Sequence, residues 1–111
     1  MKITNHIYIR IKENAFVARL AALKLGTKRA AIVFGSTIYL YGASRKDIQD
    51  NVAWMRHEVM HVLQYHREGV IRFLIKYLWL SLRFGYRNNP LEKEARNAEN
   101  DKEILNKVHF L

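Results

Sequence analysis

The sequence contains no cysteine. Disulfide bonds are therefore excluded, and so is a zinc site built on thiolates, which leaves His, Asp and Glu as the residue types that could hold zinc. Long hydrophobic runs are missing as well, because no stretch reaches the roughly 18 uncharged apolar residues of a membrane-spanning helix. Residues 1–7 lack the apolar run and small-residue cleavage site of a signal peptide. We therefore expect a cytoplasmic protein.

Acidic residues are few: ten Asp and Glu stand against 19 Lys and Arg, for a net charge of +9. A field of this sign attracts anions such as nucleic acid, an anionic membrane surface or an acidic polypeptide. No recognised nucleic-acid-binding motif is present, and basic proteins without any such partner have similar compositions. The charge leaves a membrane surface or a nucleic acid open as a partner and favours neither.

The length of 111 residues predicts one domain, spanning 1–111. Residues 3–12 alternate between apolar and polar, the pattern of a half-buried strand. Residues 30–34 and 37–41 are β-rich and flank Gly35 and Ser36, which predicts a hairpin with a two-residue turn.

Four helices are expected from periodicity and capping residues. The first is capped by Asn14 and stops at Gly26; the second opens at Ser44 or Asp47 and runs unbroken to Glu68; the third covers 70–84; the last begins at Pro90 and reaches about Val108. Strands come early and helices late, so the order predicts an α+β domain.

The second helix contains the run His57-Glu58-Val59-Met60-His61. Residues four apart on a helix point about 40° apart, so both imidazoles can hold one metal ion while Glu58 projects to the side as a general base. Zinc in such a site lowers the pKa of its bound water to about 7. The alternative is a helix that carries two surface histidines. The surrounding helical pattern argues against it, because apolar residues can bury the opposite face: Val52, Met55, Val59, Val62 and Leu63.

A catalytic zinc site needs a third protein ligand. His66 lies about 140° round the helix from His61 and faces away, and His109 stands near the end of the sequence. A carboxylate in the run 90–96 is the better candidate.

These two motifs resemble those of the gluzincins, the thermolysin-like zinc peptidases. Residues 57–64 resemble the active-site helix of small bacterial gluzincin-like domains, and residues 89–95 resemble their E-x-x-A glutamate helix. The resemblance implies a minimal zincin-like domain, with a small β-sheet and hairpin plus these two helices.

By the same resemblance His57 and His61 are zinc ligands, Glu58 is the base and Glu92 is the third ligand, with Glu94 as the fallback. Glu92 and Glu94 lie about 200° apart on a helix, so they cannot face the metal equally. Either carboxylate could instead be a first-turn residue favoured by the helix dipole.

One position departs from the pattern. Related families often carry an acidic residue after the alanine of E-x-x-A, where it orients a ligand histidine; this chain has Arg96. Glu99 is the candidate to replace it.

The resemblance also implies peptide binding along an edge strand, for which 37–41 is our candidate, although an ordinary core strand would have the same sequence. Tyr65 and Tyr86 are candidates to stabilise an oxyanion.

The run 70–87 is almost wholly apolar apart from four basic residues within about 60° of helical arc: Arg72, Lys76, Arg83 and Arg87. We interpret 70–84 as a core helix with one solvated basic stripe, because a small protein must bury a large fraction of its apolar residues. A homo-oligomer interface through this helix is the main alternative. A membrane-surface helix or a contact with phosphates is less favoured.

The sequence therefore predicts a zinc-dependent metallopeptidase acting on a peptide or protein substrate. The second hypothesis is a zinc-binding regulatory or interaction module with little turnover. A third is a basic protein associated with a membrane or a nucleic acid.

Overall fold

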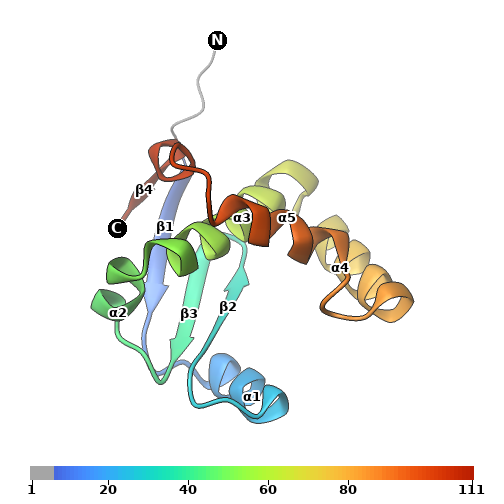
Figure 1. Ribbon diagram of the computed structural model, residues 1–111, viewed down its shortest axis with the longest axis horizontal. Coiled ribbons are helices and arrows are strands. Elements are labelled where there is room, and N and C mark those ends of the chain that lie inside the picture. Colours follow the sequence, from blue (N-terminus) through green and yellow to red (C-terminus); the bar gives the residue numbers. More distant parts are fainter. Residues whose placement is uncertain (1–6) are drawn as a thin grey trace.

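The computed structural model describes residues 7–111, so the predicted strand residues 3–6 lie outside the described part. Strands and helices alternate early and helices dominate later, which confirms the α+β class (Figure 1). The elements are β1 (Ile7–Lys12), α1 (Phe16–Leu25), β2 (Ala30–Phe34), β3 (Thr37–Tyr41), α2 (Arg45–Asp50), α3 (Val52–Glu68), α4 (Val70–Phe84), α5 (Pro90–Ala98), a 3₁₀ helix (Ile104–Lys107) and β4 (Val108–Phe110).

The strands of the described residues form one mixed sheet in the order β2-β3-β1-β4. β2 and β3 form the predicted antiparallel hairpin, and β1 runs parallel to both β3 and β4. The expectation that Thr37–Tyr41 is an edge strand is wrong, because β3 lies between β2 and β1. It pairs with both neighbours, and its residues Ile38 and Leu40 share the face of the sheet that packs into the core. Ala30–Phe34 forms the edge instead.

The expected unbroken helix from Ser44 to Glu68 is two helices. Ser44 begins α2 with a capping box, accepting from the Asp47 N–H while its own N–H donates to the Asp47 carboxylate. The chain then turns at Asn51, which caps α3 by accepting from the Trp54 N–H at 3.1 Å. An asparagine that caps a helix competes with helical hydrogen bonding, and this explains the break.

Two other helix boundaries were wrong. Asn14 does not cap α1: it adopts a left-handed conformation (φ 52°), and Ala15 takes the cap position without a side-chain bond. The last helix stops at Ala98 rather than near Val108. Ile104 and Val108 are buried in the core, and β4 pairs with β1.

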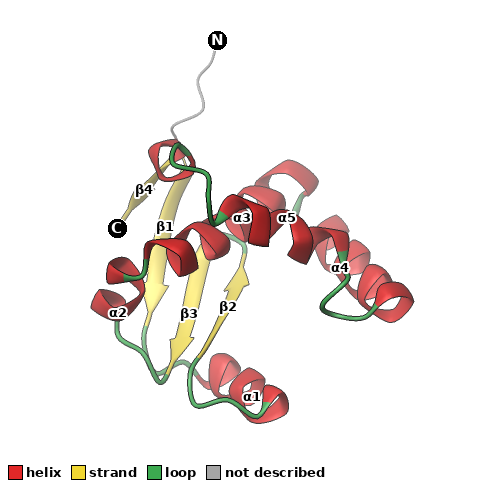
Figure 2. Cartoon of the chain, viewed as in Figure 1, coloured by secondary structure: helices red, strands yellow, loops and turns green. Residues whose placement is uncertain are grey.

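The core lies where α3 crosses one face of the sheet (Figure 2). It includes Ile9, Ile38, Leu40, Ile48, Met55, Val59 and Val62. A smaller cluster of Tyr65, Phe73 and Leu91 joins α3, α4 and α5. No helix within residues 7–111, the described range, is both long and apolar enough to cross a membrane.

The interpretation of 70–84 as a core helix is wrong. Within α4, which is described throughout, Phe73 is the one buried residue. The helix packs on α3 through a single side, so most of its large apolar residues remain exposed: Ile71, Ile75, Leu78, Trp79, Leu82 and Phe84.

Candidate metal centre

Helices α3 and α5 bring three predicted residues together. His57 and His61 share one face of α3, one turn apart, as their spacing predicts. Glu92 lies in the first turn of α5, which Asn89 begins by accepting from the Leu91 N–H at 2.8 Å. One ligand atom from each of the three residues lies within 4.8 Å of the others, an arrangement that could hold a metal ion.

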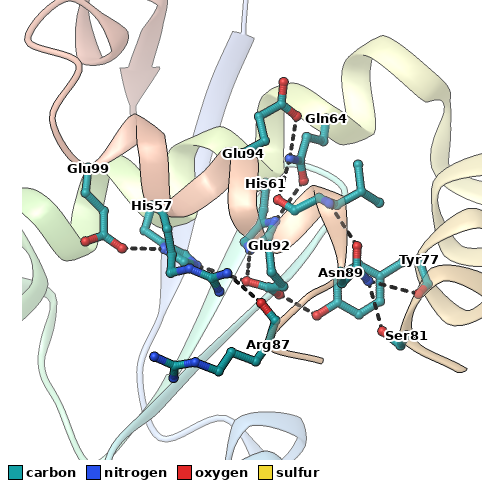
Figure 3. Close-up of polar contacts among 12 residues, drawn as sticks. His57, His61, Gln64, Tyr77, Ser81, Arg87, Asn89, Glu92, Glu94 and Glu99 are labelled. Atoms are coloured by element: carbon teal, nitrogen blue, oxygen red, sulfur yellow. Dashed lines mark hydrogen bonds and ion pairs between the residues drawn. The ribbon is translucent and has the colours of Figure 1, made fainter. Parts of the chain in front are cut away.

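The spacing of these atoms suits a tetrahedral ion. The Nε2 atoms of His57 and His61 lie 3.2 and 3.3 Å from the same oxygen, Oε1 of Glu92 (Figure 3). Ligands about 2.0–2.1 Å from a zinc ion in tetrahedral geometry are separated by about 3.4 Å. The donor types, two imidazoles and one carboxylate, match a zinc site that keeps its fourth position open.

The other ring nitrogen of His57 is held by the residue that caps the end of α5. Nδ1 lies 2.8 Å from Oε2 of Glu99, and Arg56 donates to the Glu99 backbone carbonyl at 3.0 Å. A proton on Nδ1 that donates to this carboxylate leaves the Nε2 lone pair facing the cluster. Glu99 therefore occupies the orienting role that the sequence left open at Arg96, whose guanidinium instead donates to the Arg87 carbonyl.

His61 is oriented by an amide. Its Nδ1 lies 2.8 Å from Oε1 of Gln64, which is fully buried. The Gln64 amide nitrogen donates to the Leu91 carbonyl at 2.9 Å and to Glu94 at 2.8 Å, which fixes the oxygen toward His61. Arg67 in turn makes two bonds of 3.0 Å to Glu94. Glu94, the fallback ligand, thus lies behind Gln64 and outside the three-residue cluster.

Tyr77 contributes a contact that the sequence reasoning missed. Its hydroxyl donates to Oε2 of Glu92, so Oε1 is the carboxylate oxygen left facing the histidines. Asn89 donates to the Tyr77 carbonyl and to Ser81. The sequence offered little signal for this contact, because Tyr77 is one aromatic residue among many apolar ones in α4.

Without a metal ion, the cluster behaves as an imidazolium–carboxylate group. Burial alone would lower the pKa of His57, but the bonds to Glu92 and Glu99 and the charge of Glu58 outweigh it and raise this pKa to about 9. The pKa of His61 is also raised: burial opposes the shift, and the bond to Glu92 outweighs it. The pKa of Glu92 is held well below its usual range, because both histidine bonds overcome its burial.

Glu58 is buried beside the histidines, with 7% of its surface exposed. Burial raises its pKa, and the nearby His57 and His61 charges counteract that shift. A carboxyl group with a raised pKa is better matched to proton transfer near neutral pH than an exposed one.

A groove of about 470 Å³ opens onto the cluster. Its walls come from α1, the edge strand β2, α3 and α4, and it includes Glu58, both histidines and Glu92. Tyr86 also lines it and is half exposed. Tyr65 does so as well, but its hydroxyl donates to the Val33 carbonyl of β2 at 3.0 Å. The Tyr65 hydroxyl is therefore already bonded to the sheet. Tyr86 remains as the candidate on the groove wall to stabilise an oxyanion.

Two other histidines lie elsewhere, as expected. His66 bonds to Ser36 across 2.6 Å, and His109 stacks on Tyr8 in the sheet. Comparisons of this chain with protein-family models, with curated proteins and with solved structures gave no match.

Proposed function

We propose that the protein is a zinc-dependent metallopeptidase with a minimal zincin-like fold. The observation that carries the proposal is the convergence of His57, His61 and Glu92 on one point, with buried Glu58 beside them. Zinc is the usual metal in a His₂Glu catalytic site. The resemblance of the two helical motifs to those of gluzincins supports the same assignment.

In this proposal each residue has a defined task. His57, His61 and Glu92 hold the ion, which when bound supplies a Lewis acid and lowers the pKa of water. Glu58 accepts a proton on its carboxylate from the attacking water and delivers it to the nitrogen of the departing amine. Glu99, Gln64 and Tyr77 keep the three ligands oriented.

The substrate proposed is a peptide lying along β2. β2 forms an edge of the sheet in the described residues and also lines the groove beside the cluster. An extended peptide can add to such an edge through main-chain hydrogen bonds. Tyr86, on the groove wall, is the proposed donor to the developing oxyanion.

The test combines elemental analysis with a peptide-library assay. Wild type should contain about one zinc ion per chain, and His57→Ala and Glu92→Ala should lose it. Glu94→Ala is the matched control and should keep the zinc, since Glu94 lies behind Gln64. Glu58→Gln should keep zinc and lose hydrolysis. No zinc in wild type after reconstitution would overturn the proposal.

The alternative of a zinc-binding module with little turnover had one argument in its favour, the basic residue at Arg96. The bond from His57 to Glu99 supplies the orienting carboxylate by another route. A module without turnover would retain zinc and show no hydrolysis in wild type or in Glu58→Gln.

A further inference from the structure

Helix α4 exposes an apolar stripe along its length. Ile71, Ile75, Leu78 and Leu82 recur every three or four residues, so they share one helical face. Each of these four side chains is between 63% and 85% exposed. The opposite face, with Phe73 and Tyr77, packs on α3 and on the candidate metal centre.

A basic stripe runs beside the apolar one. Arg72, Lys76 and Arg83 lie about 110° round the helix from the centre of the apolar stripe. Trp79, which is exposed, falls between the two stripes. The sequence of α4 contains no acidic residue; Lys76 pairs with Glu68, at the end of α3, across 3.1 Å. Apolar side chains flanked by cations, with an indole at the boundary, are typical of helices that lie in a membrane interface.

Helix α1 repeats the arrangement. It turns small residues, Ala18 and Ala22, toward the body of the protein, while Phe16, Leu20 and Leu23 are exposed. Helical spacing puts Arg19 on one side of this stripe and Lys24 on the other. α1 also has no acidic residue.

We propose that the exposed faces of α4 and α1 dock on the surface of an anionic lipid bilayer. The apolar stripes enter the boundary of headgroups and acyl chains, and Arg72 and Arg83 of α4, with Arg19 and Lys24 of α1, contact lipid phosphates. A second copy of the chain fits less well, because self-association through α4 would bring together two basic stripes of a protein with net charge +9. Nucleic acid would satisfy the basic residues but would leave Ile75 and Leu82 in water.

Membrane docking does not depend on the proposed hydrolysis, but it would determine which substrates the proposed peptidase can reach. The groove at the candidate metal centre is walled by Ala21 and Leu25 of α1 and by Leu74 of α4. Docking through these two helices places the groove close to the lipid surface. If the protein is a peptidase, its substrates are then membrane-proximal polypeptide segments.

The test is sedimentation of the full chain with vesicles, one set of phosphatidylcholine and one of phosphatidylcholine with an equal part of phosphatidylglycerol. Binding to the anionic vesicles only, with a shift of tryptophan emission to shorter wavelength, is the expected result. Arg72→Gln/Arg83→Gln should weaken binding about thirtyfold. Lys102→Gln/Lys107→Gln removes the same charge from exposed positions elsewhere and should weaken it far less.

Leu78→Ser/Leu82→Ser tests the apolar stripe and should weaken vesicle binding at least tenfold. Both side chains are exposed, so circular dichroism should show an unchanged fold. Equal binding by this variant, no binding by wild type, or a wild-type dimer that the variant dissociates would each overturn the proposal. His57→Ala should bind vesicles like wild type, which separates this result from the fate of the metal centre.

Discussion

Nδ1 of His57 and Oε2 of Glu99 lie 2.8 Å apart, across the junction of α3 and the end of α5. This contact connects the first histidine of the helical motif to a carboxylate that follows the last turn of the glutamate helix. Glu99 lies outside both sequence motifs, and through this contact it orients the proposed ligand His57.

Replacing Glu99 by Gln should weaken zinc binding by about 10- to 100-fold, the usual effect of losing a group that orients a metal-bound histidine. The ligands themselves remain, so the stoichiometry should stay at one zinc per chain. Competition with a chromogenic chelator measures the affinity. Glu103→Gln is the control, because Glu103 bonds to Asn106 and not to the cluster. Equal affinities of Glu99→Gln and wild type would disprove the role.

Removing the Tyr77 hydroxyl should loosen Glu92. Tyr77→Phe keeps the packing against Phe73 and deletes the bond to Oε2 of Glu92. We expect about a tenfold loss of zinc affinity, comparable with other residues that support metal ligands. Tyr86→Phe should leave affinity unchanged and lower the rate of peptide hydrolysis, because Tyr86 lines the groove and is the proposed donor to the oxyanion. A loss of affinity in both variants would contradict this division of roles.

The parts of the fold that could be predicted depend on local signals. The β2–β3 hairpin and the face shared by His57 and His61 follow from residue spacing alone. β4 could not be predicted, because three residues carry no measurable periodicity and the strand exists through pairing with β1. The exposure of α4 was missed for a related reason: an apolar sequence does not reveal whether a partner element covers it.

The candidate site shows the same limit. The E-x-x-A resemblance favoured Glu92 over Glu94, and the structure brings Glu92 to the histidines. The place of Glu94 could not be read from the sequence, because it depends on Arg67 and Gln64 of another helix. The edge strand was wrongly assigned to Thr37–Tyr41, because strand order depends on the pairing of β1 with β3, and residue spacing within a strand does not reveal that pairing.

Lowering the pH should remove the contribution of the α2 cap to the free energy of unfolding. The backbone N–H of Ser44 donates to Asp47, and this bond, with the Ser44 hydroxyl, lowers the Asp47 pKa below its ordinary 3.8. A lowered pKa stabilises the fold above pH 3.8, and the stabilisation is lost as pH falls through the folded-state value. Asp47→Asn should therefore have a lower free energy of unfolding than wild type at neutral pH, and the difference should shrink below pH 3.8. Urea titrations across this range measure it, and a constant difference would refute the assignment.

Removing the metal should lower thermal stability. A ligand that binds only the folded state at 100 times its Kd stabilises that state by about 2.7 kcal/mol, which corresponds to roughly 10 °C in Tm for a chain of this size. A chelator should therefore lower the Tm of wild type by about this amount, and added zinc should restore it. His57→Ala has lost a ligand, so its Tm should not respond to chelator or to zinc. An equal response in this variant would place the stabilising ion somewhere other than the cluster of His57, His61 and Glu92.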